Sequence, residues 1–98
     1  MDIRLIKAPG ENTLRIISER SKYKIENKPG AIGLVQGKLI EMISASDIAE
    51  KSVGVEVFDV RGSCPQNFVL LAIVGDMEEV KVALENIRAG GDLRNGNC

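Results

Sequence analysis

Residues 67–76, NFVLLAIVGD, include the most hydrophobic stretch of the chain, and this stretch decides the fold class. An unbroken run of branched and aliphatic side chains predicts a strand over 67–74. Residues 55–60, VEVFDV, alternate apolar and polar side chains, which indicates a half-buried strand. The segment 61–66, RGSCPQ, joins the two strands. We therefore expect a hairpin-like pair with a tight loop of small residues between them.

The period of the sequence changes to that of a helix after Gly75. Asp76 and Glu79 have the spacing of a capping box, so they predict the first turn of this helix. One apolar stripe follows at helical spacing and consists of Met77, Val80, Leu84 and Ile87. Gly90-Gly91 is expected to end the helix, and the polar residues 92–98 are expected to form a flexible tail.

A strand followed by a helix is also predicted upstream of the hairpin. Residues 31–35, AIGLV, form a short apolar run after a Pro-Gly turn signal, as is typical of a strand buried on both faces. Residues 36–38 are expected to turn the chain. A helix is predicted from residue 39 to about residue 52. The apolar residues at its helical spacing are Leu39, Ile40, Met42, Ile43, Ile48 and Ala49.

The N-terminal part of the chain predicts two more strands and a connector. Residues 3–6 are apolar and partly alternating, and a turn signal at 8–12, APGEN, follows them. The β-branched content of 13–18, TLRIIS, favours a second strand. The polar residues 19–28 are expected to form a solvated connector. The predicted order is strand, strand, strand, helix, strand, strand, helix, which makes a single α+β domain with a mostly antiparallel sheet and two helices.

Length and composition set limits on the function. A chain of 98 residues makes one domain, and 44% hydrophobic with 28% charged residues is ordinary for a globular protein. Thirteen basic against fourteen acidic residues give a net charge of −1, so no nucleic-acid partner is expected. No apolar run is long enough to span a bilayer, and the N-terminus lacks the layout of a signal peptide. We therefore expect a cytoplasmic protein without a membrane partner.

The absence of histidine excludes most catalytic arrangements. Without imidazole, no Ser/His or Cys/His nucleophile can form within one chain, and zinc sites that need histidine are excluded too. The carboxylates form no convincing acid–base pair either, so an enzyme is not expected. Two cysteines, Cys64 and Cys98, are too few for a disulfide framework or for the thiolates of a metal cluster. A cluster would have to take its ligands from several copies of the chain.

The segment Gly62-Ser63-Cys64-Pro65-Gln66 carries the strongest candidate for chemistry. A cysteine followed by proline often closes the binding run of an iron–sulfur cluster. Gly62 lets backbones approach closely, and Pro65 stiffens the loop because its φ angle is fixed. A lone cysteine between two strands is, however, more often a small buried hydrophobe. The local sequence leaves both interpretations open.

Several segments, taken in order, resemble the shell domain of bacterial microcompartments. The run AIGLV at 31–35, the helix core Ala45-Ser46-Asp47 and the run VGVEV at 53–57 match its first half. The pair Gly75-Asp76, followed by VKVAL at 80–84, matches the start of its second helix. Each piece is short, but the ordered set is fairly specific.

The N-terminal end resembles the circularly permuted shell proteins of the ethanolamine and propanediol type. In the usual order of the domain a further strand follows the second helix, whereas here the extra strands come first. In the permuted proteins the first strand joins copies from other subunits in a small β-barrel over one face of a hexamer, and residues 3–6 would be that strand. The resemblance implies one permuted, ferredoxin-like domain over 1–91, with 1–8 as its N-terminal strand and 92–98 as a flexible tail.

In this family the loop between the paired strands lines the central pore of the hexamer, and 61–66 falls there. Sixfold symmetry would place six Cys64 thiols around one axis, where three alternate thiols could ligate three irons of a cubane [4Fe-4S] cluster. The loop also resembles that of the shell protein associated with glycyl-radical-enzyme microcompartments, a subtype linked to iron–sulfur binding in the pore. The resemblance therefore implies Cys64 as the metal ligand. The other expected pore residues are Arg61, Gly62, Ser63, Pro65 and Gln66.

The resemblance implies a homohexamer that tiles with other shell proteins into the shell of a cytoplasmic microcompartment. Its pore would carry small metabolites or, with a cluster, electrons. The alternative is a small-molecule-sensing regulatory domain on a ferredoxin-like fold, which would form dimers.

Overall fold

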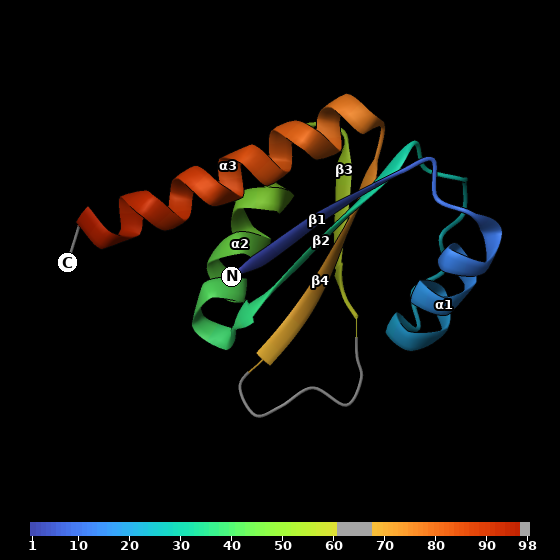
Figure 1. Cartoon of the computed structure of the whole chain (residues 1–98), viewed down its shortest axis with the longest axis horizontal. Coiled ribbons are helices and arrows are strands. Elements are labelled where there is room, and N and C mark those ends of the chain that lie inside the picture. The colour runs from blue at the N-terminus through green and yellow to red at the C-terminus, as the bar shows by residue number, and fades with distance from the viewer. Residues whose placement is uncertain (61–67, 97–98) are drawn as a thin grey trace.

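The computed structural model describes the backbone of residues 1–60 and 68–96 and the side chains of 1–60 and 68–90. Figure 1 shows one sheet with two helices over one face and a third helix set apart from them. The elements are β1 (Asp2–Lys7), α1 (Glu11–Ser21), β2 (Ala31–Lys38), α2 (Leu39–Glu50), β3 (Val55–Asp59), β4 (Phe68–Gly75) and α3 (Met77–Gly96). The predicted α+β class is confirmed, with three helices among the described residues in place of two. None of these helices is long and apolar enough to cross a membrane.

The sheet has the strand order β1-β2-β4-β3, and each neighbouring pair is antiparallel. β3 and β4 form the hairpin-like pair that the alternation predicted. β1 pairs with β2 along its whole length, beginning with Asp2 opposite Gln36. Its side chains Ile3 and Leu5 pack against the core of the domain itself. β1 is thus an edge strand of the domain's own sheet.

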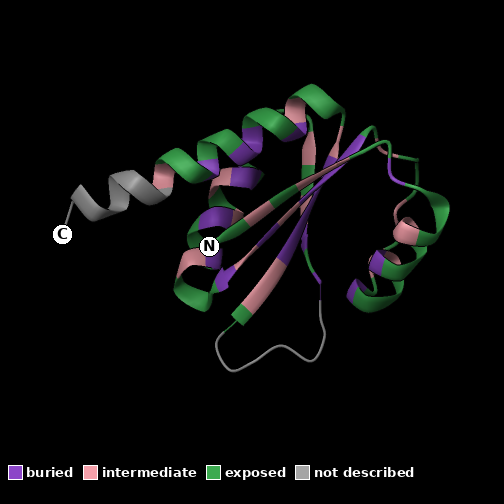
Figure 2. Cartoon of the chain, viewed as in Figure 1, coloured by how far each residue is buried: buried purple, intermediate pink, exposed green. Residues whose placement is uncertain are grey.

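Two hydrophobic cores lie on opposite faces of the sheet, because successive side chains of a strand point to opposite faces (Figure 2). α2 and α3 cover the larger core, in which Val35, Ile73 and Val80 are fully buried. Ile17 of α1 belongs to the smaller core on the other face. The strand residues of that smaller core are Ile32, Phe58, Ala72 and Val74, with Val60 after β3.

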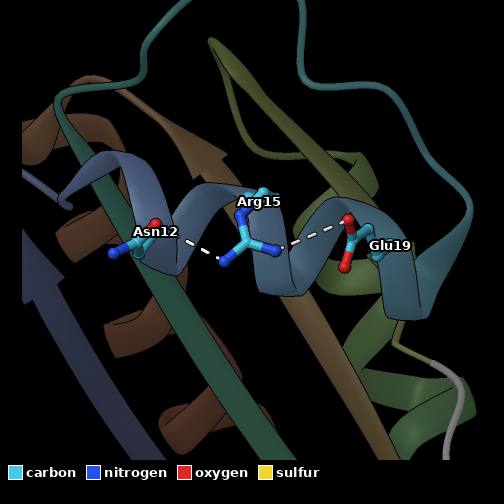
Figure 3. Close-up of polar contacts among 3 residues, drawn as sticks. All are labelled: Asn12, Arg15 and Glu19. Atoms are coloured by element: carbon cyan, nitrogen blue, oxygen red, sulfur yellow. Dashed lines mark hydrogen bonds and ion pairs between the residues drawn. The ribbon is translucent and has the colours of Figure 1, made fainter.

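The strand predicted over 13–18 was wrong, because these residues lie in helix α1. The polar side chains of α1 also recur at helical spacing. Arg15 donates a hydrogen bond to Asn12 Oδ1 at 3.5 Å and forms an ion pair with Glu19 Oε2 at 3.7 Å (Figure 3). On the opposite side, Ile17 and Ser21 are buried. Such i, i+3 and i, i+4 neighbours exist only on a helix. The pattern of one apolar face therefore overrode the strand preference of the β-branched side chains.

The turn predicted at 36–38 was also wrong, since β2 continues to Lys38 and α2 begins at the next residue. The Lys38 backbone N–H donates to Glu41 Oε1 at 3.0 Å, half of a capping box. Glu41 thus satisfies a backbone donor where the strand ends, so the chain needs no separate turn. The predicted helix over 39–52 is confirmed, with α2 ending at Glu50.

α3 begins where the sequence predicted, but it does not end at Gly90-Gly91 as expected; it continues to Gly96. A Cβ atom at Gly90 would lie 2.5 Å from Cδ1 of Ile48 in α2, so a side chain there would require the end of the Ile48 side chain to shift. The glycine therefore permits the close approach of two helices. It does not act as a helix cap, which is the other common use of glycine at such a position.

Candidate functional site

The loop singled out by the sequence lies outside the described residues, and the structure fixes the two points from which it leaves the sheet. The expected pore residues that lie there are Arg61, Gly62, Ser63, Cys64, Pro65 and Gln66. Its first anchor, Val60, is buried, and the Val60 N–H donates to the carbonyl of Leu70 at 2.8 Å. Its second anchor, Phe68, starts β4. The first end is thus held by a hydrogen bond to β4, and the second end by the pairing of β4 with β2.

The anchor at Phe68 lies beside the junction of β2 and α2. Phe68 is the cross-strand partner of Lys38, the last residue of β2. The start of α2 is therefore adjacent to the start of β4 at one end of the sheet (Figure 1). Residues 61–67 leave the sheet at this end, which we call the loop end.

The described residues offer no ligand set for an iron–sulfur cluster. They contain no cysteine, because Cys64 and Cys98 both lie outside them. No group of three histidine, cysteine, aspartate or glutamate side chains within 1–60 and 68–90 could hold a metal ion. Such clusters are held by thiolates, with histidine in some types. The donor set therefore fits a cluster only if the loops of several copies meet.

Four exposed apolar side chains lie near the loop end. Three belong to the first turns of α2, and Phe68 is the fourth; the α2 residues are Leu39, Ile40 and Ile43. The exposed fraction is 75% for Ile40 and 64% for Ile43. The sequence pattern assigned both isoleucines to the stripe that faces the core, and that assignment was wrong. A signal was present, because residues 39, 40, 42 and 43 form an apolar arc of about 160° around the helix axis at 3.6 residues per turn, which is wide enough to indicate burial on more than one side.

A groove among the described residues lies at the opposite end of the sheet. It has a volume of about 330 Å³ and runs between the segment 25–29 and the turn from β4 into α3. Its charged lining residues are Glu26, Lys28, Glu56, Asp76 and Glu79. Its lining residues include no thiol and no hydroxyl nucleophile.

Tyr23 lies next to this groove and packs flat on Phe58, with ring centroids 4.1 Å apart and planes within 6°. Burial raises the pKa of Tyr23 above its usual value of 10.0, and the nearby Glu56 carboxylate raises it further. Both effects oppose formation of the phenolate. Tyr23 is thus neutral at neutral pH.

In an alkaline titration, Tyr23 is expected to lose its proton at a higher pH than a free tyrosine does. Tyr23 is the one tyrosine of the chain, so phenolate absorbance reports it alone. We expect a midpoint above 10.0 in the folded protein. A raised pKa means that the stability from neutral Tyr23 is complete below the unfolded pKa and is lost as pH rises through the folded pKa. In Tyr23→Phe, chemical denaturation is expected to lose that part of the alkaline pH dependence, and an unshifted midpoint in the parent would contradict the assignment.

Comparison with known proteins agrees with the fold. The family model described as "BMC domain" matches residues 31–98. The GrpU microcompartment shell protein from Clostridiales bacterium 1_7_47FAA, in a ligand-free structure, is 42% identical over 91% of this chain and 92% of that chain, with a TM-score of 0.71. The GrpU microcompartment shell protein from Pectobacterium wasabiae, also ligand-free, is 28% identical over 89% and 99% of the two chains, with a TM-score of 0.72. No curated protein matches the sequence.

Proposed function

Because this chain belongs to the BMC domain family and is a microcompartment shell protein, we propose that it forms homohexamers with a central pore lined by residues 61–66. These hexamers tile with other shell proteins into the shell of a cytoplasmic compartment. The observation that carries the proposal is the likeness to microcompartment shell proteins over nine-tenths of the chain. The position of the loop supports it, since both anchors lie at one end of the sheet, where several copies can bring their loops to one axis.

The order of elements supports a circular permutation within the family. The family model begins at residue 31, so β1 and α1 precede the matched region. β1 nevertheless completes the same sheet as β2. We propose that β1 takes the place of the strand that follows the second helix in the usual order, with the permuted domain extending over 1–91.

The pore is also the proposed site of an iron–sulfur cluster, with Cys64 as its ligand. One thiol per chain becomes six around a sixfold axis, and three alternate thiolates can hold three irons of a [4Fe-4S] cluster. Gly62, Ser63 and Pro65 would form the wall around it. The chain would supply the thiolates and exclude water, and a bound cluster would supply one-electron transfer across the shell. A role in glycyl-radical-enzyme compartments belongs to the same proposal.

Sedimentation and electron microscopy test the assembly. The purified chain is expected to sediment with six times the mass of one chain and to form sheets of hexamers on a grid. A dimer that changes size with an added amino acid would instead favour the sensing domain and contradict the shell proposal. Iron and acid-labile sulfide counted per hexamer after isolation without oxygen test the cluster separately, because a hexamer without either would leave the shell proposal intact.

A further inference from the structure

The apolar residues of α2 that face solvent form a ridge along one side of the helix. We call Leu39, Ile40 and Ile43 the α2 ridge. Ile40 and Ile43 are three residues apart and therefore neighbours on the helix surface. Both face solvent, whereas Met42 and Ala45 of the same helix are buried in the core. Exposed apolar side chains that gather in this way mark an interaction surface in soluble proteins.

A second apolar surface lies on the opposite face of the sheet. Along β4 the exposure rises from buried Val74 and Ala72, through half-buried Leu70, to Phe68, which is 42% exposed. Along β2 the exposure of this face also increases, from buried Ile32 to half-buried residues near the loop end. α1 covers the buried part through Ile17, and this cover ends partway down the sheet.

The exposed part of this face is defined by five residues that point to the same side as the smaller core. Cross-strand partners share one face, which joins Leu34 to Arg4 on β1, Gln36 to Leu70, and Lys38 to Phe68. We call Leu34, Gln36, Lys38, Phe68 and Leu70 the open sheet face. The chain thus presents two different apolar surfaces, on opposite faces of the sheet and both towards the loop end.

We propose that the α2 ridge of one copy packs on the open sheet face of a second copy of this chain, and that this contact builds the ring. The inference rests on the proposed hexamer and names the surfaces that join its subunits. A contact between two different surfaces is head-to-tail, and it closes into a ring when the rotation between copies is right. One chain carries both surfaces, so each subunit gives its ridge to one neighbour and its sheet face to the other.

Charge is complementary as well. Beyond Ile43 the same stripe of α2 continues with Asp47 and Glu50, and Lys51 lies 2.8 Å from Asp47, which leaves one net negative charge beside the ridge. On the other side, Arg4 and Lys38 against Asp2 leave one net positive charge beside the open sheet face. Opposite charges on two contacting surfaces favour the correct register of the contact.

The location of the two surfaces is consistent with a pore at the centre of the ring. Both surfaces lie towards the end of the sheet from which residues 61–67 leave. Subunits that join through this end bring their loops close to the symmetry axis. Joining through the groove end would instead place the loops on the outside of the ring.

Two surface variants test the inference. Ile40→Glu with Ile43→Glu removes the ridge, and both sites are exposed enough for the fold to tolerate the change. Gln36→Glu with Phe68→Glu removes the sheet face, and the new carboxylate at 68 faces Lys38 in the same chain. Ile16→Glu on α1 is the matched control, because it makes the same change at another exposed isoleucine, away from both surfaces. Circular dichroism checks that each variant is folded.

Sedimentation equilibrium then gives the mass of each variant. We expect the ridge variant alone and the sheet-face variant alone to be monomers, while Ile16→Glu stays hexameric. An equal mixture of the two monomeric variants keeps one intact ridge and one intact sheet face, so it is expected to form a dimer and nothing larger.

The remaining outcomes overturn the inference in distinguishable ways. If both variants stay hexameric, the ridge and the sheet face do not join subunits, and the proposed hexamer stands. If the ridge variant is monomeric, the sheet-face variant is hexameric and the mixture gives no dimer, the ridge packs on something other than the open sheet face. If the parent chain is itself monomeric, or assembles only with a different shell protein, a second copy is not the occupant and the homohexamer fails with the inference.

Discussion

Cys64→Ser protein purified without oxygen is expected to be colourless, while the parent protein is brown with broad visible absorption. The substitution is expected to remove essentially all of the iron and acid-labile sulfide, because every thiolate ligand in the proposed cluster comes from a copy of this one residue. A serine hydroxyl is a poor substitute for thiolate towards iron in such clusters. The expected effect is all or none, since one substitution changes all subunits of the ring at once.

Cys98→Ser provides the matched control for this prediction. It removes the other thiol of the chain and is expected to keep the colour, the iron and the sulfide. A parent protein that stays colourless after anaerobic reconstitution with iron and sulfide would sink the cluster proposal. Equal loss in both cysteine variants would contradict the assignment to Cys64. Neither result bears on assembly, which sedimentation measures independently.

Ile73→Ala is expected to destabilise the domain by roughly 2–5 kcal/mol. Ile73 is fully buried on β4, between β2 and β3, with Gly33 and Val57 as its cross-strand partners. Removing its side chain leaves a cavity below α2 and α3, which the surrounding strands cannot close. A small domain has only about 5–15 kcal/mol of stability, so the loss is a large part of the total.

Urea denaturation at one fixed protein concentration measures this loss, since assembly itself contributes to stability. Val82→Ala on α3 is the control, because Val82 is exposed and its truncation is expected to change the free energy of unfolding by less than about 0.5 kcal/mol. Equal midpoints for Ile73→Ala and Val82→Ala would show that β4 is not the centre of the core.

The sequence predicted best where one physical signal acted alone. The hairpin-like pair and the start of α3 follow from a long apolar run and a change of period, and both were confirmed. α1 was missed because two signals competed there: β-branched side chains favour a strand, while Ile17 and Ser21 recur at helical spacing. The packing of one helical face decided between them, and packing depends on residues elsewhere in the chain.

Glycine was misread for a related reason. Gly90 has two common uses in a helix, and the local sequence does not separate them. Its use here depends on Ile48, which belongs to another helix and lies far away in the sequence. A contact of this kind becomes visible only in three dimensions.

The candidate site was likewise predicted only in part. The loop carrying Cys64 was located from the sequence, and its flanking strands are as expected, whereas its ligand role stays a prediction. The exposure of Ile40 and Ile43 was not foreseen, since the pattern was interpreted as a single core-facing stripe. The apolar arc at the start of α2 is wider than one contact with the core covers, and the proposed ring would bury the exposed part.

The two edges of the sheet carry a consequence for how a shell grows. β1 and β3 each leave one side of their backbone unpaired, which in many proteins invites unlimited strand-to-strand polymerisation. Both edges are guarded by exposed charges, namely Asp2, Arg4 and Lys7 on β1 and Glu56 and Asp59 on β3. These charges disfavour the addition of subunits through backbone hydrogen bonds between strand edges. Subunits joined in that way would dissociate very slowly. Contacts between side chains can dissociate and re-form, so a misplaced subunit can leave a growing shell and be replaced.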